Sequence, residues 1–417
     1  MKNVSDIKRD ENLNFVLSDK YVNNKDNPIL PKQMAVFIHL HYADTVKNYF
    51  SYIVNIPESI DVYITVSDET TRMEIDECIK YYGLKNCTVI VKKNRGRDIS
   101  ALLVACRDRI QEYEYACFTH DKKEKNNYQK RDVQCWVEEI WENLIGSTEY
   151  IYNIKELLDK NEGLGLLVPP NPLTDQLSFA VTNTWKNNFK LTQKLAEELG
   201  LICEISEDKS PITLGTAFWC RVTALKKLFL KEWVYEDFQD EPLPDDGTIS
   251  HAIERILAYV AQDAGYFTGN IMTDTYAGKQ FEYRNIILMK SFEQLRKAFG
   301  IGSVNDLFNY DLNRKKIADF CSLYTNIYIY GAGAFGNKVL LIMQTLNKKP
   351  KAFVVSDGER TENDLYSIPI LELSEVEVQL NDKCGIILGV SPRYIDEIKQ
   401  HLEQKKVDFL EVFTNSH

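Results

Sequence analysis

Two short charged motifs each follow an apolar run in this sequence. Asn94–Asp98 reads Asn-Arg-Gly-Arg-Asp and follows Cys87–Val91, while His120–Lys123 reads His-Asp-Lys-Lys and follows Tyr115–Thr119. Guanidinium groups bind phosphates through paired hydrogen bonds, and lysines add positive charge. Both apolar runs are rich in β-branched and aromatic residues, which is typical of buried strands. Since ligands of open α/β sheets bind outside the carboxyl ends of the strands, the two motifs predict one site for an anionic ligand.

Each motif also has a purely structural interpretation. Gly96 permits a tight turn, and Asp98 can cap a following helix while the arginines stay solvated. The His120–Lys123 segment can equally be a solvated lysine-rich loop. Because the motifs occur together, we expect one ligand site that includes Asn94, Arg95, Arg97, Asp98, His120, Lys122 and Lys123. The arginines and lysines would bind the anion, and Asp98 would orient the loop or contact another part of the ligand. Asp121 is a single carboxylate, so we expect lysines to neutralise the ligand, and a divalent cation stays an open alternative.

A third polar segment, Asp245–Arg255, opens a predicted helix. Asp246 or Thr248 can cap this helix, and acids at a helix start need no catalytic explanation. Polar side chains nevertheless share a face there, since His251 and Arg255 lie one turn apart. A reaction at a hydroxyl needs a carboxylate or imidazole that removes its proton. Asp246 is the first candidate for that base, with Asp245 and His251 as alternatives.

Two histidines, His39 and His41, follow the first predicted strand. They point the same way where the strand continues. Two histidines alone make a poor metal site, and the six histidines of the chain show no zinc-ligand spacing. Contact with the ligand, or a hydrogen-bonded structural position, is therefore expected.

A glycine motif begins a second pattern near the C-terminus. Gly331-x-Gly333-x-x-Gly336 follows an apolar run and precedes a predicted helix, which is the context of a dinucleotide-binding turn. Asp357 ends the next strand, where an acid binds the ribose in such folds. NAD, a sugar nucleotide and a scaffold without a ligand all remain open for this domain.

Strands and helices alternate along both patterns. Predicted strands cover 34–40, 61–66, 87–91, 115–119 and 165–168, with helices over 44–54, 68–82, 98–111, 133–144, 150–161, 190–199 and 248–264. This alternation predicts an α/β fold with a parallel, doubly wound sheet and flanking helices. We expect an N-terminal arm over 1–32, a first domain over 33–270, a helical connector over 271–322 and a small Rossmann-like nucleotide-binding domain over 323–417.

Composition narrows the partners and the compartment. The net charge of -11, from 50 basic and 61 acidic residues, argues against general nucleic-acid binding. Nine cysteines without CxxC pairs are typical of reduced thiols in the cytosol. The N-terminus has no signal-peptide pattern, and no apolar stretch is long enough to span a membrane. We therefore expect a cytoplasmic protein without a membrane span.

The polar motifs form an ordered set along the chain. His39-x-His41-Tyr42, Asn94–Asp98, His120-x-Lys122-Lys123, Gly215–Trp219 and Asp246–Arg255 occur in this order. Over about residues 33–270, this set resembles the rhamnan synthesis protein F family of bacterial cell-wall and lipopolysaccharide glycan assembly. The resemblance implies an A-type glycosyltransferase fold. It also implies transfer of a sugar, with dTDP-linked rhamnose as the expected donor, to a lipid-linked or oligosaccharide acceptor at the inner face of the membrane.

The resemblance also assigns roles to single residues. Asp246 would act as base in an inverting transfer, and Trp219 would stack on a sugar face. The remaining expected substrate contacts are His39, His41, Glu254 and Arg255. Two alternatives stay open. One is a non-catalytic scaffold that binds a nucleotide or a glycan; the other is an NAD-dependent sugar-modifying C-terminal domain, which lacks a Tyr-x-x-x-Lys pair after Gly336.

Overall fold

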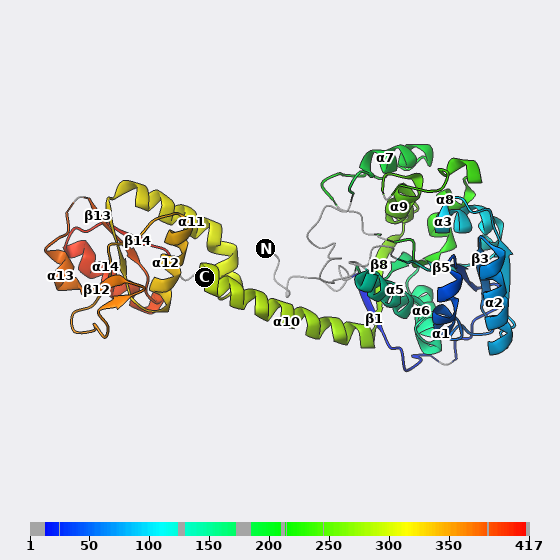
Figure 1. Ribbon diagram of the computed structural model, residues 1–417, viewed down its shortest axis with the longest axis horizontal. Coiled ribbons are helices and arrows are strands. Elements are labelled where there is room, and N and C mark those ends of the chain that lie inside the picture. The colour runs from blue at the N-terminus through cyan, green and yellow to red at the C-terminus, as the bar shows by residue number, and fades with distance from the viewer. Residues whose placement is uncertain are drawn as a thin grey trace. The chain divides into compact units, whose positions relative to one another are not determined.

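The computed structural model describes residues 13–413, except 25, 124–129, 172–184, 210–212, 214, 245 and 382, and gives only the backbone of 130–132. The chain divides into two compact units between residues 280 and 281, and each is described by itself (Figure 1).

An eight-stranded sheet forms the centre of the first unit, in the order β1-β8-β6-β7-β5-β2-β3-β4. The strands are β1 (Asn14–Leu17), β2 (Met34–His39), β3 (Asp61–Val66), β4 (Cys87–Val91), β5 (Tyr115–His120), β6 (Leu164–Val168), β7 (Phe218–Arg221) and β8 (Phe267–Thr273). All neighbouring pairs are parallel except those of β7, so the predicted strands β2, β3, β4 and β5 pair in parallel as expected, and β7 makes the whole sheet mixed. The expected N-terminal arm is also corrected in part, because β1 pairs with β8 as an edge strand.

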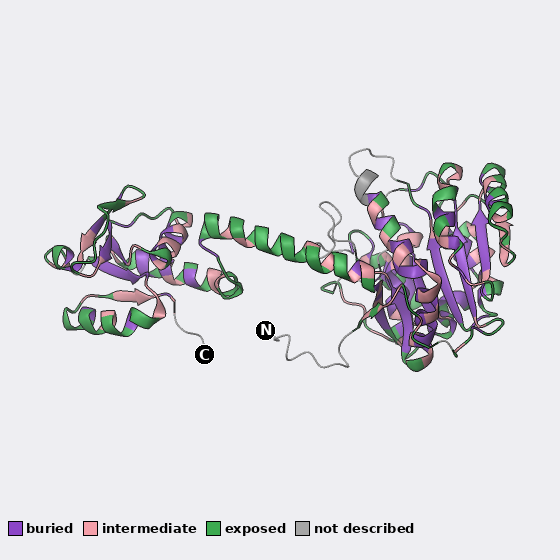
Figure 2. Ribbon diagram, turned by 90° about the horizontal axis from the view of Figure 1, so that it is seen from below, coloured by how far each residue is buried: buried purple, intermediate pink, exposed green. Residues whose placement is uncertain are grey.

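Helices cover both faces of this sheet (Figure 2). They are α1 (Val46–Ile53), α2 (Glu69–Tyr82), α3 (Arg97–Ser100), a π-helix (Ala101–Ala105), α4 (Arg107–Ile110), α5 (Lys130–Ile145), α6 (Thr148–Lys160), α7 (Phe189–Glu198), α8 (Lys226–Leu230) and α9 (Ile249–Asp263), with short 3-10 turns at Ala43–Thr45, Val222–Leu225 and Tyr235–Asp237. Successive strand residues face opposite sides, so Val36 and Ile38 join the core under α1, α2, α5 and α6. Ala35 and Phe37 join the second core, under the π-helix and α9.

Local signals explain where the helices begin and end. Asp68 caps α2 by accepting a hydrogen bond from the Thr71 amide at 2.8 Å, and Gly83 ends it with φ +67°. The predicted helix 98–111 is instead three short segments, α3, the π-helix and α4. The backbone leaves helical geometry at Cys106, with φ -109° and ψ 1°, which separates the π-helix from α4.

The second unit has a six-stranded sheet in the order β11-β12-β10-β9-β13-β14. Its strands are β9 (Asn326–Tyr330), β10 (Ala352–Val355), β11 (Asp364–Leu365), β12 (Ile368–Glu372), β13 (Cys384–Leu388) and β14 (Phe409–Glu411). Its helices are α11 (Val304–Leu323), α12 (Ala334–Thr345), α13 (Leu373–Glu377) and α14 (Ile395–Gln404), preceded by α10 (Asp274–Phe299), which crosses the boundary between the units. The predicted α/β class with a smaller second sheet is confirmed. Among the helices described, none is apolar over a bilayer-spanning length.

The strand order defines where a ligand can enter the first sheet. From β2 the chain proceeds to β3 and β4 on one side, and then to β5 on the other side of β2. The loops after β2 and β5 therefore diverge, and such a topological switch point is the usual ligand crevice of an α/β sheet.

Candidate functional site

The loops after β2 and β5 are fastened together by Asp121. Its carboxylate accepts hydrogen bonds from the amides of His41 and Tyr42, both at 2.8 Å. The side chain is buried, and burial raises its pKa to about 6 against the opposing effect of these two amides. Asp121 thus fixes the shape of the switch point.

His39 is a buried residue that supports the site through a hydrogen bond. It is 3% exposed, and its Nδ1 lies 3.0 Å from the Thr65 hydroxyl. Burial, helped by the charge of Lys92, lowers its pKa to about 3, so the ring is neutral. The expectation of a substrate contact is wrong for His39, because the strand buries it; the hydrogen-bonded alternative is confirmed. His41, further along the chain, is half-buried beside the ring of Tyr42.

The two charged motifs meet at Asp98 and His120. Nε2 of His120 lies 3.7 Å from Oδ2 of Asp98, which Thr216 also contacts through a hydrogen bond. Burial favours the neutral form of Asp98, but His120, His39 and the hydrogen bonds outweigh it and lower the pKa. Nδ1 of His120 lies 2.8 Å from the Asp121 carbonyl, which can only accept. In the neutral form of His120, Nδ1 therefore carries the hydrogen, and the lone pair of Nε2 faces Asp98. Nε2 and the Asp98 carboxylate can then accept a hydrogen bond from the same proton or ligand hydroxyl.

The guanidinium of Arg95 is held by groups of the protein itself. Its Nε donates to the Phe238 carbonyl at 2.7 Å, and its NH1 pairs with Asp240 at 2.8 Å. Arg95 therefore clamps the segment 236–241 onto the loop 93–97. The expected phosphate contact is corrected, because the guanidinium is already occupied by groups that are distant in sequence. Asn94 is exposed on the same loop.

Arg97 is the arginine that faces the switch point. Its side chain is 50% exposed, and its charge lowers the pKa of both His41 and His251, adding to the larger effect of their burial. Its backbone has φ +48°, which costs a residue with a Cβ roughly 1 kcal/mol or more. Strain held at one residue of a crevice is an indication of function.

A further cation, Lys92, belongs to the site although the two expected motifs do not include it. Its Nζ donates to the carbonyls of Lys93 at 2.9 Å and Arg95 at 3.4 Å. Burial lowers its pKa to about 8, while Asp98 and Glu241 act in the opposite direction. The signal available in the sequence was its place directly after the β4 strand.

Lys122 and Lys123 have partners at the rim. Nζ of Lys122 lies 4.5 Å from the ring centre of Trp136, and Lys123 pairs closely with Asp44. Their positive charge is therefore already partly engaged, which the sequence did not indicate because Asp44 and Trp136 lie on other elements.

The start of α9 carries the expected base. Asp246 accepts hydrogen bonds from the side chain of Asn188 at 2.6 Å and the amide of Asn187 at 3.2 Å. Burial raises its pKa, but these bonds and the charges of His251 and Arg255 lower it overall, so the group is ionised at neutral pH. Asp245 lies outside the described residues.

The other polar residues of α9 support this helix start. Nδ1 of His251 lies 2.7 Å from the hydroxyl of Thr248, the N-cap residue. Arg255 is 5% exposed, donates to the His251 carbonyl at 3.1 Å and pairs with Glu254 at 3.3 Å. Arg255 is thus a supporting residue, because burial removes it from direct contact with a substrate.

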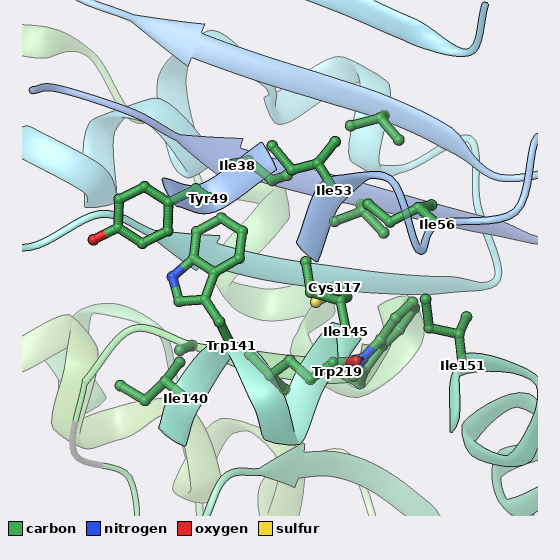
Figure 3. Packing of buried hydrophobic residues seen from close by; sticks show 14 of the residues in the cluster. Ile38, Tyr49, Ile53, Ile56, Cys117, Ile140, Trp141, Ile145, Ile151 and Trp219 are labelled. Carbon is green, nitrogen blue, oxygen red and sulfur yellow. Dashed lines mark hydrogen bonds between the residues drawn. The ribbon is translucent and has the colours of Figure 1, made fainter. Parts of the chain in front are cut away.

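Trp219 is a core residue. It is fully buried among the apolar side chains of one sheet face, as Figure 3 shows. Its Nε1 donates to the Leu144 carbonyl at 2.9 Å. The expectation that it stacks on a sugar is wrong, because β7 is an interior strand of the sheet.

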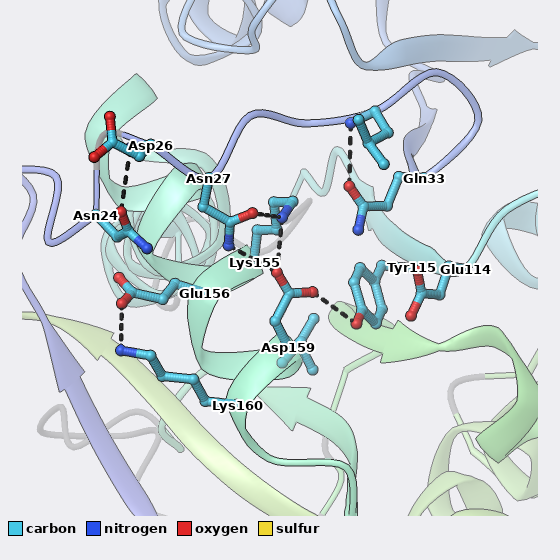
Figure 4. Close-up of polar contacts among 12 residues, drawn as sticks. Asn24, Asp26, Asn27, Gln33, Glu114, Tyr115, Lys155, Glu156, Asp159 and Lys160 are labelled. Carbon is cyan, nitrogen blue, oxygen red and sulfur yellow. Dashed lines mark hydrogen bonds and ion pairs between the residues drawn. The ribbon is translucent and has the colours of Figure 1, made fainter.

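An open polar cavity lies at the opposite edge of the sheet. Figure 4 shows the polar contacts among residues that line it. Its charged groups bind one another: Nζ of Lys155 lies 2.7 Å from Asp159, which also accepts from the Tyr115 hydroxyl at 3.0 Å. Lys155 further donates to Asn27 at 2.6 Å, which ties the N-terminal segment to α6. These contacts indicate a structural network.

The second unit repeats the switch-point topology between β9 and β13. Gly331 (φ +106°) and Gly336 pack backbone against backbone, since a Cβ on Gly336 would lie 1.9 Å from the Gly331 carbonyl oxygen. A Cβ on Gly333 would meet open space. Asp357 accepts a hydrogen bond from the Ser374 amide at 3.0 Å. Across the described residues of both units, no three His, Cys, Asp or Glu side chains gather as metal ligands.

Comparison of this chain with known proteins identifies a matching family, two curated relatives and a solved structure that are described below. The model of the family described as rhamnan synthesis protein F matches residues 1–266. Two proteins described as "Uncharacterized protein WxcX", from two strains of Xanthomonas campestris pv. campestris, are 27% identical over 233 residues, which is 56% of this chain and 32% of theirs. The chain thus spans about a third of the length of these curated relatives. A solved structure of the mannosyltransferase PcManGT from Pyrobaculum calidifontis, in complex with GDP-Man and Mn2+, matches with a TM-score of 0.33 and 12% identity, over 61% of this chain and 60% of that one.

Proposed function

This chain belongs to the rhamnan synthesis protein F family, and we propose that it is a glycosyltransferase that uses a nucleoside-diphosphate sugar. One observation carries the proposal: Arg97 and Lys92 lie at the switch point beside the Asp98–His120 pair. Positive charge at the carboxyl ends of parallel strands suits a diphosphate. The acceptor is a bacterial cell-surface polysaccharide in lipid-linked or oligosaccharide form, at the cytoplasmic face of the membrane.

Each residue then has a chemical role. Arg97 neutralises the leaving diphosphate directly, the buried Lys92 adds its positive charge from inside the fold, and Lys122 and Lys123 add positive charge at the rim. Asp246, ionised at neutral pH, removes the proton of the acceptor hydroxyl in an inverting transfer. We propose dTDP-linked rhamnose as donor, on the family name alone.

Asp98 and His120 have a second role in this proposal. Oδ2 of Asp98 and Nε2 of His120, which lie 3.7 Å apart, accept hydrogen bonds from hydroxyl groups of the sugar or nucleoside. These atoms are also the oxygen and nitrogen donors available to a divalent cation on the diphosphate. Such an ion would add positive charge to the leaving group when bound.

Isothermal titration with dTDP, UDP and GDP, each with and without Mg²⁺ or Mn²⁺, tests the donor site. We expect binding of one nucleotide that is weakened at least tenfold in Arg97→Ala and retained in Arg107→Ala, a partly exposed matched variant outside the site. Absence of binding to all three nucleotides would remove the donor-site assignment. Binding without transfer across a panel of donors and acceptors would favour the non-catalytic scaffold.

We also propose that the second unit binds a nucleotide at Gly331–Gly336. The motif glycines at its two ends have packing reasons to be glycine, whereas Gly333 has neither a positive φ nor a close neighbour. Close approach of a pyrophosphate explains a glycine there, and Asp357 would contact the ribose. Gly333→Val should abolish binding of NAD or a sugar nucleotide while the protein stays folded, with a loss of about 1 kcal/mol because Gly333 is the N-cap of α12; unchanged binding contradicts the assignment.

A further inference from the structure

Three ion pairs join a basic loop to an acidic segment at the rim of the switch point. The loop 93–97 presents every second side chain to the segment 236–241. The pairs are Lys93–Glu236 at 3.0 Å, Arg95–Asp240 at 2.8 Å and Arg97–Glu241 at 3.5 Å. The acidic segment thus neutralises the loop that the sequence predicted to bind an anion.

The middle of this segment is firmly held. Phe238 is 1% exposed, and its ring lies over Gly96, where a Cβ would come within 2.5 Å of it. Arg95 binds the carbonyls of Phe238 and Glu236 as well as Asp240. The clamp therefore belongs to the folded state and is not expected to open for a ligand.

The Arg97–Glu241 pair is different. Within the described residues, the guanidinium of Arg97 forms one ion pair, at 3.5 Å, and both side chains are partly exposed, at 50% and 31%. The charge of Glu241 raises the pKa of His41 and of Lys92, in opposition to the larger effect of burial on both. Its carboxylate therefore lies close to the groups that would bind the diphosphate, where it repels an anion.

We propose that Glu241 is the resident counter-ion of Arg97, which an incoming diphosphate displaces. The inference rests on the proposed donor site. An exposed pair of this kind contributes little, so a ligand with several negative charges can replace the single carboxylate. Glu241 then sets a threshold: pyrophosphate-containing ligands bind, and singly charged anions do not displace it. Glu241 is a specificity-determining residue on this account.

Titration of the full chain with inorganic pyrophosphate tests this without knowledge of the base or sugar. Glu241→Gln should lower the Kd about 3- to 10-fold at low salt, with a smaller gain at high salt. Glu236→Gln is the matched control, because it removes the same charge from the same segment but at the outer pair with Lys93. Thermal unfolding confirms that each variant is folded.

The effect must also pass through Arg97. In an Arg97→Ala background, where pyrophosphate binding is at least tenfold weaker, Glu241→Gln should tighten binding by a smaller factor than it does in the wild-type chain. Equal tightening by Glu236→Gln and Glu241→Gln, or no tightening by either, would overturn the counter-ion role while leaving the donor site intact. No pyrophosphate binding by the wild type or any variant would instead refute the donor site itself, and the inference with it.

Discussion

Nε2 of His120 lies 3.7 Å from the carboxylate of Asp98, although two strands separate β4 from β5 in the sheet. After β4 the chain turns at Gly96 (φ +74°), and Asp98 follows in α3. Two motifs that follow strands separated in the sheet thereby meet at one place.

Asp246→Asn should reduce sugar transfer at least 100-fold and leave nucleotide affinity unchanged. The amide keeps the size of the carboxylate but cannot take up the proton of the substrate hydroxyl. Transfer is measured by nucleotide release from dTDP-, UDP- and GDP-sugars. Asp108→Asn, at an exposed side chain outside the site, is the control. Full turnover in Asp246→Asn would exclude it as the base.

Arg97→Gly should raise the free energy of unfolding by about 1 kcal/mol while it weakens pyrophosphate binding at least tenfold. Glycine relieves the strain of φ +48° but removes the guanidinium. Lys406→Gly, at φ +56° in the second unit, should stabilise similarly without a change in binding. Denaturant unfolding and calorimetric titration measure the two effects. A loss of stability in Arg97→Gly would contradict the assignment of strain.

His39 should make the protein sensitive to acid. The pKa of its imidazole is about 3 in the folded chain and 6.5 in the unfolded chain. Below pH 6.5 the unfolded chain therefore binds a proton that the folded chain does not bind. The free energy of unfolding therefore falls by about 1.4 kcal/mol for each unit by which the pH falls between 6.5 and 3. Asp121, raised to about 6, acts in the opposite direction between pH 6 and about 4.

Substitution separates these two contributions. His39→Gln should lose stability less steeply than the wild type as pH falls from 6.5, whereas Asp121→Asn should lose it more steeply between pH 6 and about 4. Urea unfolding at pH 7, 6, 5 and 4 gives the slopes. Parallel curves for wild type and His39→Gln would show that His39 titrates normally.

Trp219→Phe should lower the free energy of unfolding by about 2 kcal/mol and leave nucleotide and sugar binding unchanged. The smaller ring leaves a void in the core and deprives the Leu144 carbonyl of its donor. Chemical unfolding and titration test both parts. Weakened sugar binding by a stable variant would restore Trp219 to the substrate site.

Local patterns predicted most of the elements correctly. The strands at 61–66 and 87–91 form at those bounds, and Asp68 and Gly83 delimit α2 as capping chemistry requires. The direction of β7 was not predictable, because an apolar run of four residues carries no information about which neighbour it pairs with. The strand at 14–17 was missed because its apolar run, Phe15–Leu17, is only three residues long and lies within a polar segment.

The sequence alone determined that two charged motifs end two strands of an α/β sheet, because strand periodicity and turn residues are local properties. The tertiary structure decided which charges remain for a ligand. Arg95 and Lys123 find partners that are distant in sequence, and Arg255 is buried, while the charges of Arg97 and Lys92 both act on His41 at the switch point. Partner choice and burial depend on contacts between segments far apart in the chain, such as the loop 93–97 and the segment 236–241, and no local pattern encodes those contacts.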